Sequence, residues 1–480
     1  MASEENGKAA AAGGPARKAR GGAGRGDKIA LVSLGCPKNL VDLQVVASAL
    51  RGAGFDVGVP EAEADAILVN TCAFIESARR EAVDAIAEAC ARKCDPRSRC
   101  RAVVVSGCLP QRYRSAVFEA CPDVDAVIGV DDLEEAPAVV RRALDGPGAG
   151  IDGVSPGRSK KLFTSREPWF TLTPGPYAYL KIGEGCRHAC AFCAIPGIRG
   201  RLRSKPEDAL VAEAEALLGR GIRELDVIAQ DVTSYGMDLR DGTSLSSLLR
   251  RLDGFGGEYR VRLLYGHPAR CTDELLDTVA ASRHVLPYFD IPIQHASASV
   301  LAAMDRRDTV SLVPGMAARI RRRVPGAVLR TTCLVGFPGE TRKDFEALLR
   351  HVRETRYDHL GAFVFSPEEG TKAASMPAQV PARTAMRRRG ALMQLQAGIV
   401  AEKLESLVGS ETEVLLETPP PRRGGAWTGR CRRQAPDDID GTTSVRGLPP
   451  TAKAGDFVRC RIVGHTDYDL IAKPLPDHEP

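Results

Sequence analysis

Three cysteines that lie 36 residues apart, Cys36, Cys72 and Cys108, each follow a short apolar run. Short apolar strands separated by segments of helical periodicity predict a parallel, doubly wound α/β sheet. Ligands bind beyond the carboxyl ends of the strands in such sheets, so the three cysteines are expected to meet at one edge. The expected strands cover 29–34, 66–70, 102–106 and 125–130, and the expected helices cover 41–50 and 76–93.

A second group of cysteines, Cys186, Cys190 and Cys193, is packed into the run from Gly185 to Cys193, directly after an expected strand at 177–182. Three thiolates can bind three irons of a four-iron cluster and leave the fourth iron open for chemistry. The alternative is a zinc site with His188 as the fourth ligand. Zinc sites usually pair two Cys-x2-Cys-like halves, and no second half lies nearby.

Strands and helices alternate again after this motif. Six βα units predict an open or partial β/α barrel, with its site at the carboxyl ends of the strands. The turn at 336–341 and the pair Gln294-His295 can serve a ligand, or they can be an ordinary turn and a core residue. The further expected strands are 225–229, 261–265, 288–291, 328–334 and 359–365, and the expected helices are 206–218, 273–282, 299–304 and 343–354.

The chain divides by composition. Its last part reads as a helix from Arg383 to about Leu407, followed by a small antiparallel β-barrel with strands at 414–416, 457–462 and 468–471. Residues 410–472 contain nine Lys/Arg and nine Asp/Glu, whereas a surface that grips a phosphate backbone needs a basic surplus. The expected units are a disordered basic tail (1–27), the first sheet domain (28–145), a Gly/Pro/Ser-rich linker (146–165), the β/α barrel domain (166–405) and the small β-barrel (406–475).

The composition indicates a cytoplasmic protein that is not bound to a membrane. The 480 residues contain 14 cysteines but no secretory signal and no apolar run long enough to span a bilayer. In a reducing compartment these cysteines are expected to be metal ligands or buried thiols rather than disulfides. Cys90, Cys94 and Cys100 lie close in sequence but on a helix and a surface loop, so no metal role is expected there. The remaining five are isolated and are expected to pack in cores: Cys121, Cys271, Cys333, Cys431 and Cys460.

In its β/α context, the tight cysteine motif resembles the signature of radical S-adenosylmethionine (SAM) enzymes. A preceding sheet domain with three strand-end cysteines, followed by a terminal barrel that looks like a TRAM domain, resembles the methylthiotransferase family within that class. The likeness spans about Lys28 to Ala472. One departure is Leu43-Gln44, where the family usually has Ser-Glu. The matching pieces are Ser33-Leu34-Gly35-Cys36-Pro37-Lys38-Asn39, Val69-Asn70-Thr71-Cys72 and Ser106-Gly107-Cys108.

The resemblance implies an enzyme with two [4Fe-4S] clusters that uses SAM. Cys186, Cys190 and Cys193 would bind the cluster that cleaves one SAM to a 5′-deoxyadenosyl radical. This radical would remove a hydrogen atom from the substrate, so no acid–base residue is expected. The three widely spaced cysteines would bind an auxiliary cluster that carries the sulfur, which a second SAM methylates. An electron donor of the flavodoxin or ferredoxin type and a sulfur source are further implied partners.

The family has branches with different substrates. The chain looks most like the branch that modifies the β-carbon of an aspartate in protein uS12 of the small ribosomal subunit. An alternative is the branch that modifies adenosine in transfer RNA, and a third reading is a non-catalytic, zinc-stabilised ribosome-binding module. The segments that favour the first branch are 35–39, 292–297, 365–371 and 435–441.

Overall fold

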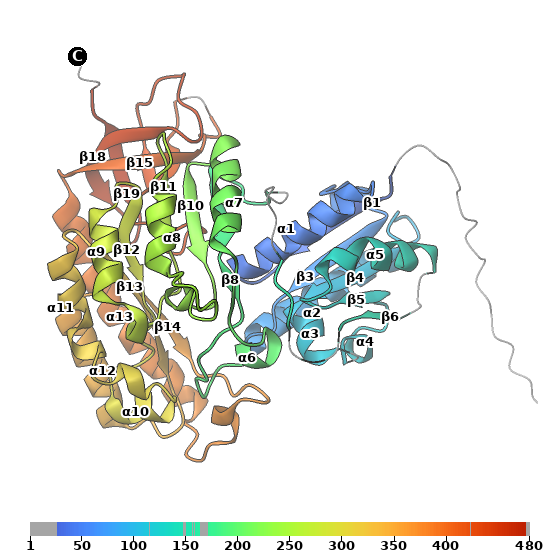
Figure 1. Ribbon diagram of the computed structural model, residues 1–480, viewed down its shortest axis with the longest axis horizontal. Helices are drawn as coiled ribbons and strands as arrows, with labels where there is room; N and C mark the ends of the chain where they lie inside the picture. Colours follow the sequence, from blue (N-terminus) through green and yellow to red (C-terminus); the bar gives the residue numbers. More distant parts are fainter. Residues whose placement is uncertain are drawn as a thin grey trace, which may run out of the picture.

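The structure is a computed structural model that describes residues 26–114, 116–146, 150–155, 157, 159–163, 171–422 and 424–476. Residues 1–25 of the expected tail, and parts of the expected linker, lie outside the described residues. Figure 1 shows an N-terminal α/β unit, a larger α/β unit beside it, and a β-barrel at one end of the larger unit. Among the described residues, no helix is long and apolar enough to cross a membrane.

The N-terminal unit contains the predicted parallel sheet, with strand order β2-β1-β3-β4-β5-β6. In this order, β1 connects to β2 toward one edge of the sheet, whereas β3 connects to β4 toward the other edge. The boundary between β1 and β3 is therefore the switch point at which ligands bind in such folds. Part of the expected linker is in fact the sixth strand, because β6 pairs with β5. Strand β6 was not predicted from the sequence, because Ile151 is its only large apolar residue. The strands are β1 (Lys28–Ser33), β2 (Asp56–Val57), β3 (Ala66–Thr71), β4 (Ala102–Gly107), β5 (Ala126–Ile128) and β6 (Ile151–Gly153).

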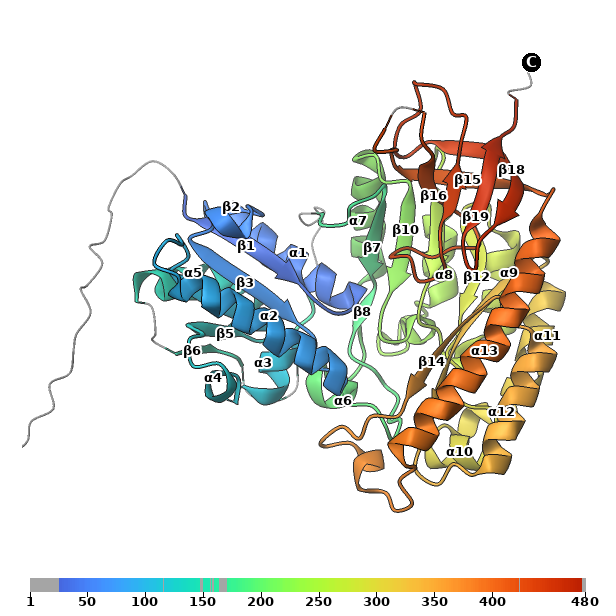
Figure 2. The same cartoon turned by 180° about the vertical axis from the view of Figure 1, so that it is seen from behind.

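Helices cover both faces of this sheet (Figure 2), as a doubly wound fold requires. Helix α2 buries Ala82, Ile86 and Ala89 as its periodicity predicted. Val83 is 37% exposed, because it lies one residue, about 100°, around the helix from Ala82. The helices are α1 (Pro37–Gly52), α2 (Glu76–Cys94), α3 (Cys108–Tyr113), α4 (Ala116–Ala120) and α5 (Ala136–Asp145), with 3-10 turns at Glu61–Glu63 and Leu133–Glu135.

The larger unit is the predicted partial β/α barrel. Its sheet has the order β14-β13-β12-β11-β10-β7, and all neighbouring strands are parallel. The strands are β7 (Tyr177–Lys181), β10 (Glu224–Ile228), β11 (Arg260–Leu263), β12 (Val285–Asp290), β13 (Val328–Val335) and β14 (His359–Val364), with a short hairpin of β8 (Gly183–Glu184) and β9 (Arg203–Ser204).

Helices pack on the outside of this sheet. Of the helices in the larger unit, α6, α8 and α11 were not predicted from the sequence. Helix α11 contains Pro314 and Gly315 and ends in three arginines, which obscures its apolar stripe. The helices are α6 (Ile195–Ile198), α7 (Glu207–Gly219), α8 (Leu245–Leu252), α9 (Asp273–Ala281), α10 (Ala298–Ala303), α11 (Val313–Arg323), α12 (Arg342–Thr355) and α13 (Ala382–Leu407), with 3-10 turns at Val232–Ser234, Pro268–Arg270, Arg307–Thr309 and Lys372–Ser375.

The C-terminal strands form a closed barrel in the order β15-β16-β17-β19-β18. The sequence predicted an antiparallel barrel, and four of the five pairings are antiparallel, whereas β17 and β19 are parallel. A closed ring with an odd number of strands cannot alternate direction throughout, so one pair must be parallel. The strands are β15 (Glu411–Thr418), β16 (Trp427–Cys431), β17 (Thr443–Val445), β18 (Phe457–His465) and β19 (Leu470–Pro474).

The C-terminal barrel is fixed to the amino-terminal ends of the β/α strands. Glu224, the first residue of β10, is fully buried and pairs with Arg260, Arg262 and Arg430. Because Cys186 follows the opposite, carboxyl end of β7, this junction leaves the mouth of the β/α barrel to the cysteine sites.

Candidate metal centres

The three widely spaced cysteines meet at the carboxyl edge of the first sheet. Cys36 is the N-cap of α1, Cys72 follows β3, and Cys108 is the first residue of α3. Burial, with smaller contributions from the nearby Cys72 and Cys36, raises the pKa of the Cys108 thiol to about 12, although Arg199 opposes the shift. The fold thus gathers this group, hereafter the wide trio, at the β1/β3 switch point and the end of β4.

Two glycines allow the cysteine-bearing turns to approach one another. A Cβ on Gly35 (φ 91°) would lie 2.6 Å from Cys72 Cβ, and a Cβ on Gly107 (φ 100°) would lie 2.6 Å from the Thr71 carbonyl oxygen. No other residue type adopts this backbone region without strain, and none would fit these gaps. Each glycine directly precedes a cysteine, so a turn at each of these positions is recognisable in the sequence.

A buried polar frame holds the ends of the three strands in register. The Asn39 amide donates to the Thr71 carbonyl at 2.8 Å, and the Asn70 amide donates to the Asn39 carbonyl at 2.8 Å. The Thr71 hydroxyl donates to the Ser106 carbonyl at 2.7 Å. These side chains lie in the same short segments as the wide trio. Their hydrogen bonds therefore hold the cysteine-bearing strand ends together.

The second cysteine group, hereafter the tight trio, lies on a loop whose base is closed by the β8–β9 hairpin. The Cys186 N–H donates to the Gly200 carbonyl at 3.2 Å, and the Ala191 N–H donates to the Met304 carbonyl at 3.0 Å. The Arg306 guanidinium lies beside the loop, with Nε 3.5 Å from Cys190 Sγ. Burial raises the pKa of Cys186 to about 11 and that of Cys193 to about 12.

The geometry disfavours a single zinc ion bound by the tight trio and His188. His188 Nε2 lies 2.8 Å from Asp231 Oδ2, and its ring stacks on His267 with 3.8 Å between centroids. Among the described residues, the one group of three ligand atoms within 4.8 Å of one another is His188, His267 and Asp308, and neither cysteine trio forms such a group. Sulfurs around one zinc ion lie about 4 Å apart, so neither trio is gathered closely enough for a single zinc ion.

The mouth of the β/α barrel offers free polar groups next to the tight trio. Gln230, after β10, and His267, after β11, each have a buried polar atom, Oε1 and Nε2 respectively, that has no hydrogen-bond partner within the part of the chain that the structure describes. Buried polar atoms normally have partners, so these two fit a site that binds a polar molecule such as SAM. Sequence reasoning missed both, although each lies just beyond a predicted strand.

The Gln294-His295 pair and the turn at 336–341 were the two weaker candidates for ligand contacts. The structure places His295 against this turn. His295 is fully buried, and its Nε2 lies 3.6 Å from Oε1 of Glu340, a residue of the 336–341 turn. Thr341 caps α12, which is the ordinary role of such a turn. Cys90 and Cys100 are buried and Cys94 is exposed, and the described residues hold no three-ligand group at these cysteines.

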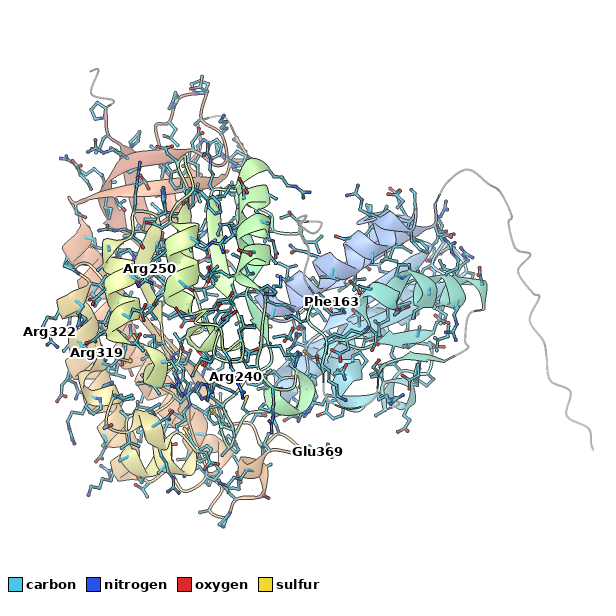
Figure 3. All side chains as sticks on the ribbon, viewed as in Figure 1. Phe163, Arg240, Arg250, Arg319, Arg322 and Glu369 are labelled. Carbon is cyan, nitrogen blue, oxygen red and sulfur yellow. The ribbon has the colours of Figure 1, made fainter. Side chains whose placement is uncertain are left out.

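A buried carboxylate joins the two α/β units beside these sites. Glu368 accepts hydrogen bonds from the guanidinium groups of Arg79 at 2.8 Å and Arg112 at 3.0 Å, and from the Glu76 N–H at 2.8 Å. Figure 3 labels the adjacent Glu369 at the edge of the larger unit that faces the N-terminal unit. The first unit is therefore fixed against the mouth of the second.

Three family profiles match the chain in succession. The uncharacterized protein family UPF0004 matches residues 28–129, the radical SAM superfamily matches 180–352, and the TRAM domain matches 408–475. A solved radical SAM methyltransferase, TsrM from Kitasatospora setae with cobalamin and a [4Fe-4S] cluster bound, shares the fold with a TM-score of 0.50 and 16% identity, over 72% of this chain and 74% of that chain.

Bacterial relatives are similar over nearly the whole chain. A protein of Syntrophus aciditrophicus named ribosomal protein uS12 methylthiotransferase RimO is 43% identical, over 94% of this chain and 99% of the relative. A protein of the same name from Trichlorobacter lovleyi is 42% identical, over 94% and 98%. Identity at this level over nearly the full length of both chains argues against the reading of this protein as a non-catalytic, zinc-stabilised module. The chain belongs to the RimO family of radical SAM methylthiotransferases.

Proposed function

We propose that this enzyme transfers a methylthio group to the β-carbon of an aspartate in protein uS12 of the small ribosomal subunit. The observation that carries the proposal is that two cysteine trios lie at one domain junction. Each trio offers three thiolates, so a four-iron cluster bound there would have one iron without a protein ligand. Arg199, from the loop of the tight trio, contacts Cys108 of the wide trio at 3.2 Å. Relatives that are similar over 94% of this chain are named ribosomal protein uS12 methylthiotransferase RimO.

In this proposal, Cys36, Cys72 and Cys108 bind one [4Fe-4S] cluster, and Cys186, Cys190 and Cys193 bind the other. When bound, the clusters and two SAM molecules supply the radical that removes a hydrogen atom, the sulfur and the methyl group. The protein's own residues hold these groups in place. Arg306 fixes Cys190, Gln230 and His267 offer polar atoms to SAM, and no side chain is required as a general base.

The charge around the sites favours a protein substrate over RNA. A groove of about 810 Å³ lies between α2 and the segment after β14. Its α2 wall carries four exposed carboxylates and one exposed arginine, so it is negatively charged and repels a phosphate backbone. These residues are Glu76, Glu81, Asp84 and Glu88, with Arg80. Ile75 in the same wall lies three residues after Cys72, so the groove begins beside the wide trio. The zero net charge of residues 410–472 supports the same choice.

We further propose a division of the chain into domains at 28–153, 166–405 and 406–475. The first domain extends beyond the expected boundary at residue 145, because β6 belongs to its sheet. We also propose a cytoplasmic location, where ribosomes are modified. An electron donor of the flavodoxin or ferredoxin type and a sulfur source complete the proposed system. The alternative substrate is adenosine in transfer RNA, with the same chemistry.

Mass spectrometry separates the two substrates. The reconstituted enzyme is given SAM, a reductant and sulfide, together with unmodified small ribosomal subunits in one reaction and unmodified transfer RNA in another. We expect the mass of one methylthio group, in place of a hydrogen, on uS12 alone. A gain on a nucleoside with none on uS12 contradicts the proposal.

A further inference from the structure

Arg199 is a buried arginine that links the two cysteine trios. It lies six residues after Cys193 and is 1% exposed, at the end of α6, which Figure 1 shows between the two α/β units. Its Nη2 donates to Cys108 Sγ at 3.2 Å and to Asn39 Oδ1 at 2.6 Å, both in the N-terminal unit. A residue carried by the loop of one site therefore contacts a ligand of the other.

The contact with sulfur is not needed to balance the local charges. Arg199 and Lys181 face the carboxylates of Asp42 and Glu184, with Arg199 Nη2 2.8 Å from Asp42 Oδ2 and Nη1 3.0 Å from Glu184 Oε2. Lys181 contacts the same two carboxylates. Two cations and two carboxylates already form a neutral group. A Cys108 thiolate then adds one negative charge, and Arg199 is the cation that faces it.

We infer that Arg199 is a positioning residue for the wide trio, and that its charge makes a cluster held there easier to reduce. The inference rests on the proposed function in one respect, which is that the wide trio binds a cluster. A charged hydrogen-bond donor on a ligand sulfur stabilises the reduced, more negative state of the cluster, so the reduction potential rises. Because this donor belongs to the loop of the tight trio, the electronic state of one site depends on the docking of the other.

Two substitutions of opposite charge distinguish this role from a purely structural one. Arg199→Gln removes a positive charge beside Cys108, whereas Asp42→Asn removes a negative charge from the same network and leaves the sulfur contact. If Arg199 only locked the domains together, both changes would loosen the same junction and move the potential in the same direction. An electrostatic role predicts shifts in opposite directions. Arg199→Lys keeps the charge but loses the planar fork that reaches several acceptors at once.

The experiment uses the full chain with Cys186, Cys190 and Cys193 replaced by alanine, so that only the wide trio can load a cluster. Iron content is measured first, and the midpoint potential is then followed by electron paramagnetic resonance in a redox titration. We expect Arg199→Gln to shift the midpoint to more negative values, Asp42→Asn to shift it to less negative values, and Arg199→Lys to fall between Arg199→Gln and the parent. A midpoint that Arg199→Gln leaves unchanged, or moves in the same direction as Asp42→Asn, overturns the inference.

Iron content keeps the possible failures apart. If the parent with three alanines binds no iron, the proposed assignment of the wide trio is wrong, and the charge of Arg199 is not the cause. If Arg199→Gln alone loses its iron, the positioning role is supported, and Arg199→Lys carries the redox test. In that case, a midpoint for Arg199→Lys that is less negative than the parent's overturns the electrostatic part.

Discussion

The Lys181 ammonium lies 2.5 Å from Asp42 Oδ1 and 2.7 Å from Glu184 Oε2, so one buried side chain joins α1 of the N-terminal unit to the strand that leads into the tight trio. All three side chains are at most 8% exposed. If Lys181 is replaced by methionine, Arg199 becomes the one cation that still pairs with the carboxylates of Asp42 and Glu184. Breaking a buried ion pair in this way is expected to cost about 3–5 kcal/mol in the free energy of unfolding, measured by denaturant titration.

The exposed pair of Arg250 and Glu274 serves as the control for this prediction. Figure 3 labels Arg250, whose side chain is 57% exposed in its pair with Glu274. Arg250→Ala is expected to cost less than about 1 kcal/mol, because surface ion pairs contribute little. Equal effects of the Lys181 and Arg250 changes would contradict the structural importance of the Lys181 contacts.

The junction between the β/α barrel and the C-terminal barrel depends on Glu224. Glu224 is fully buried against Arg260, Arg262 and Arg430, and these contacts hold the pKa of Glu224 well below its usual range although burial opposes that shift. Glu224→Gln is expected to destabilise the protein by about 3–5 kcal/mol, because the arginines lose their buried counterion. Limited proteolysis should then cleave faster near residue 408. The exposed Glu411, paired with Arg459 and Arg461, offers the matched Glu→Gln control, for which no faster cleavage is expected.

Gly107→Ala tests the close approach of the strand ends at the wide trio. The new Cβ would lie 2.6 Å from the Thr71 carbonyl oxygen at a φ of 100°, so β4 must move away from β3 and displace Cys108. We expect lower iron content at the wide trio and a loss of more than about 1 kcal/mol in stability. Gly398→Ala in α13 is the opposite-signed control, because nothing lies within 4 Å of its new Cβ and alanine favours the helix by up to about 1 kcal/mol. Full iron content in the Gly107 variant would contradict this view of the site.

Asp344 makes part of the stability depend on pH. It accepts hydrogen bonds from the hydroxyls of Ser297, Ser299 and Thr341, which hold the pKa of the Asp344 carboxyl below its usual range although partial burial opposes this shift. A carboxyl with a depressed pKa stabilises the fold above its unfolded-state pKa of about 4, and this contribution is lost as the pH falls below that value. The difference in melting temperature between the wild type and Asp344→Asn should therefore be largest near pH 6 and should shrink below about pH 4. A difference that is constant over this range would show that Asp344 does not carry the effect.

Much of the architecture could be predicted from the sequence, and so could the meeting of the wide trio at one sheet edge, because each signal was local. Cys36, Cys72 and Cys108 each follow an apolar run, and apolar runs that alternate with helices specify a parallel sheet. The short strands were missed, since two to five residues carry too little periodicity; these are β2, β6, β8, β9, β16 and β17.

The contacts between domains could not be predicted in the same way. Asp42 and Lys181 are 139 residues apart, and Arg79 and Glu368 are 289 residues apart. A charged residue on a helix normally indicates a solvated face, and only the docking of two folded units buries it. Gln230 and His267 were missed for a related reason, because their free atoms are recognisable only once the barrel is built.

We expect the two trios to bind separate clusters with different tasks. A comparison of Cys72→Ala with Cys190→Ala after anaerobic reconstitution tests this expectation. Iron is counted in each variant, and SAM cleavage and the methylthio product on uS12 are measured in the same reaction. We expect each variant to lose about half of the iron, Cys190→Ala to lose SAM cleavage, and Cys72→Ala to keep cleavage but form no methylthio product. Methylthio product from Cys72→Ala, or SAM cleavage by Cys190→Ala, would contradict the division of labour between the two trios.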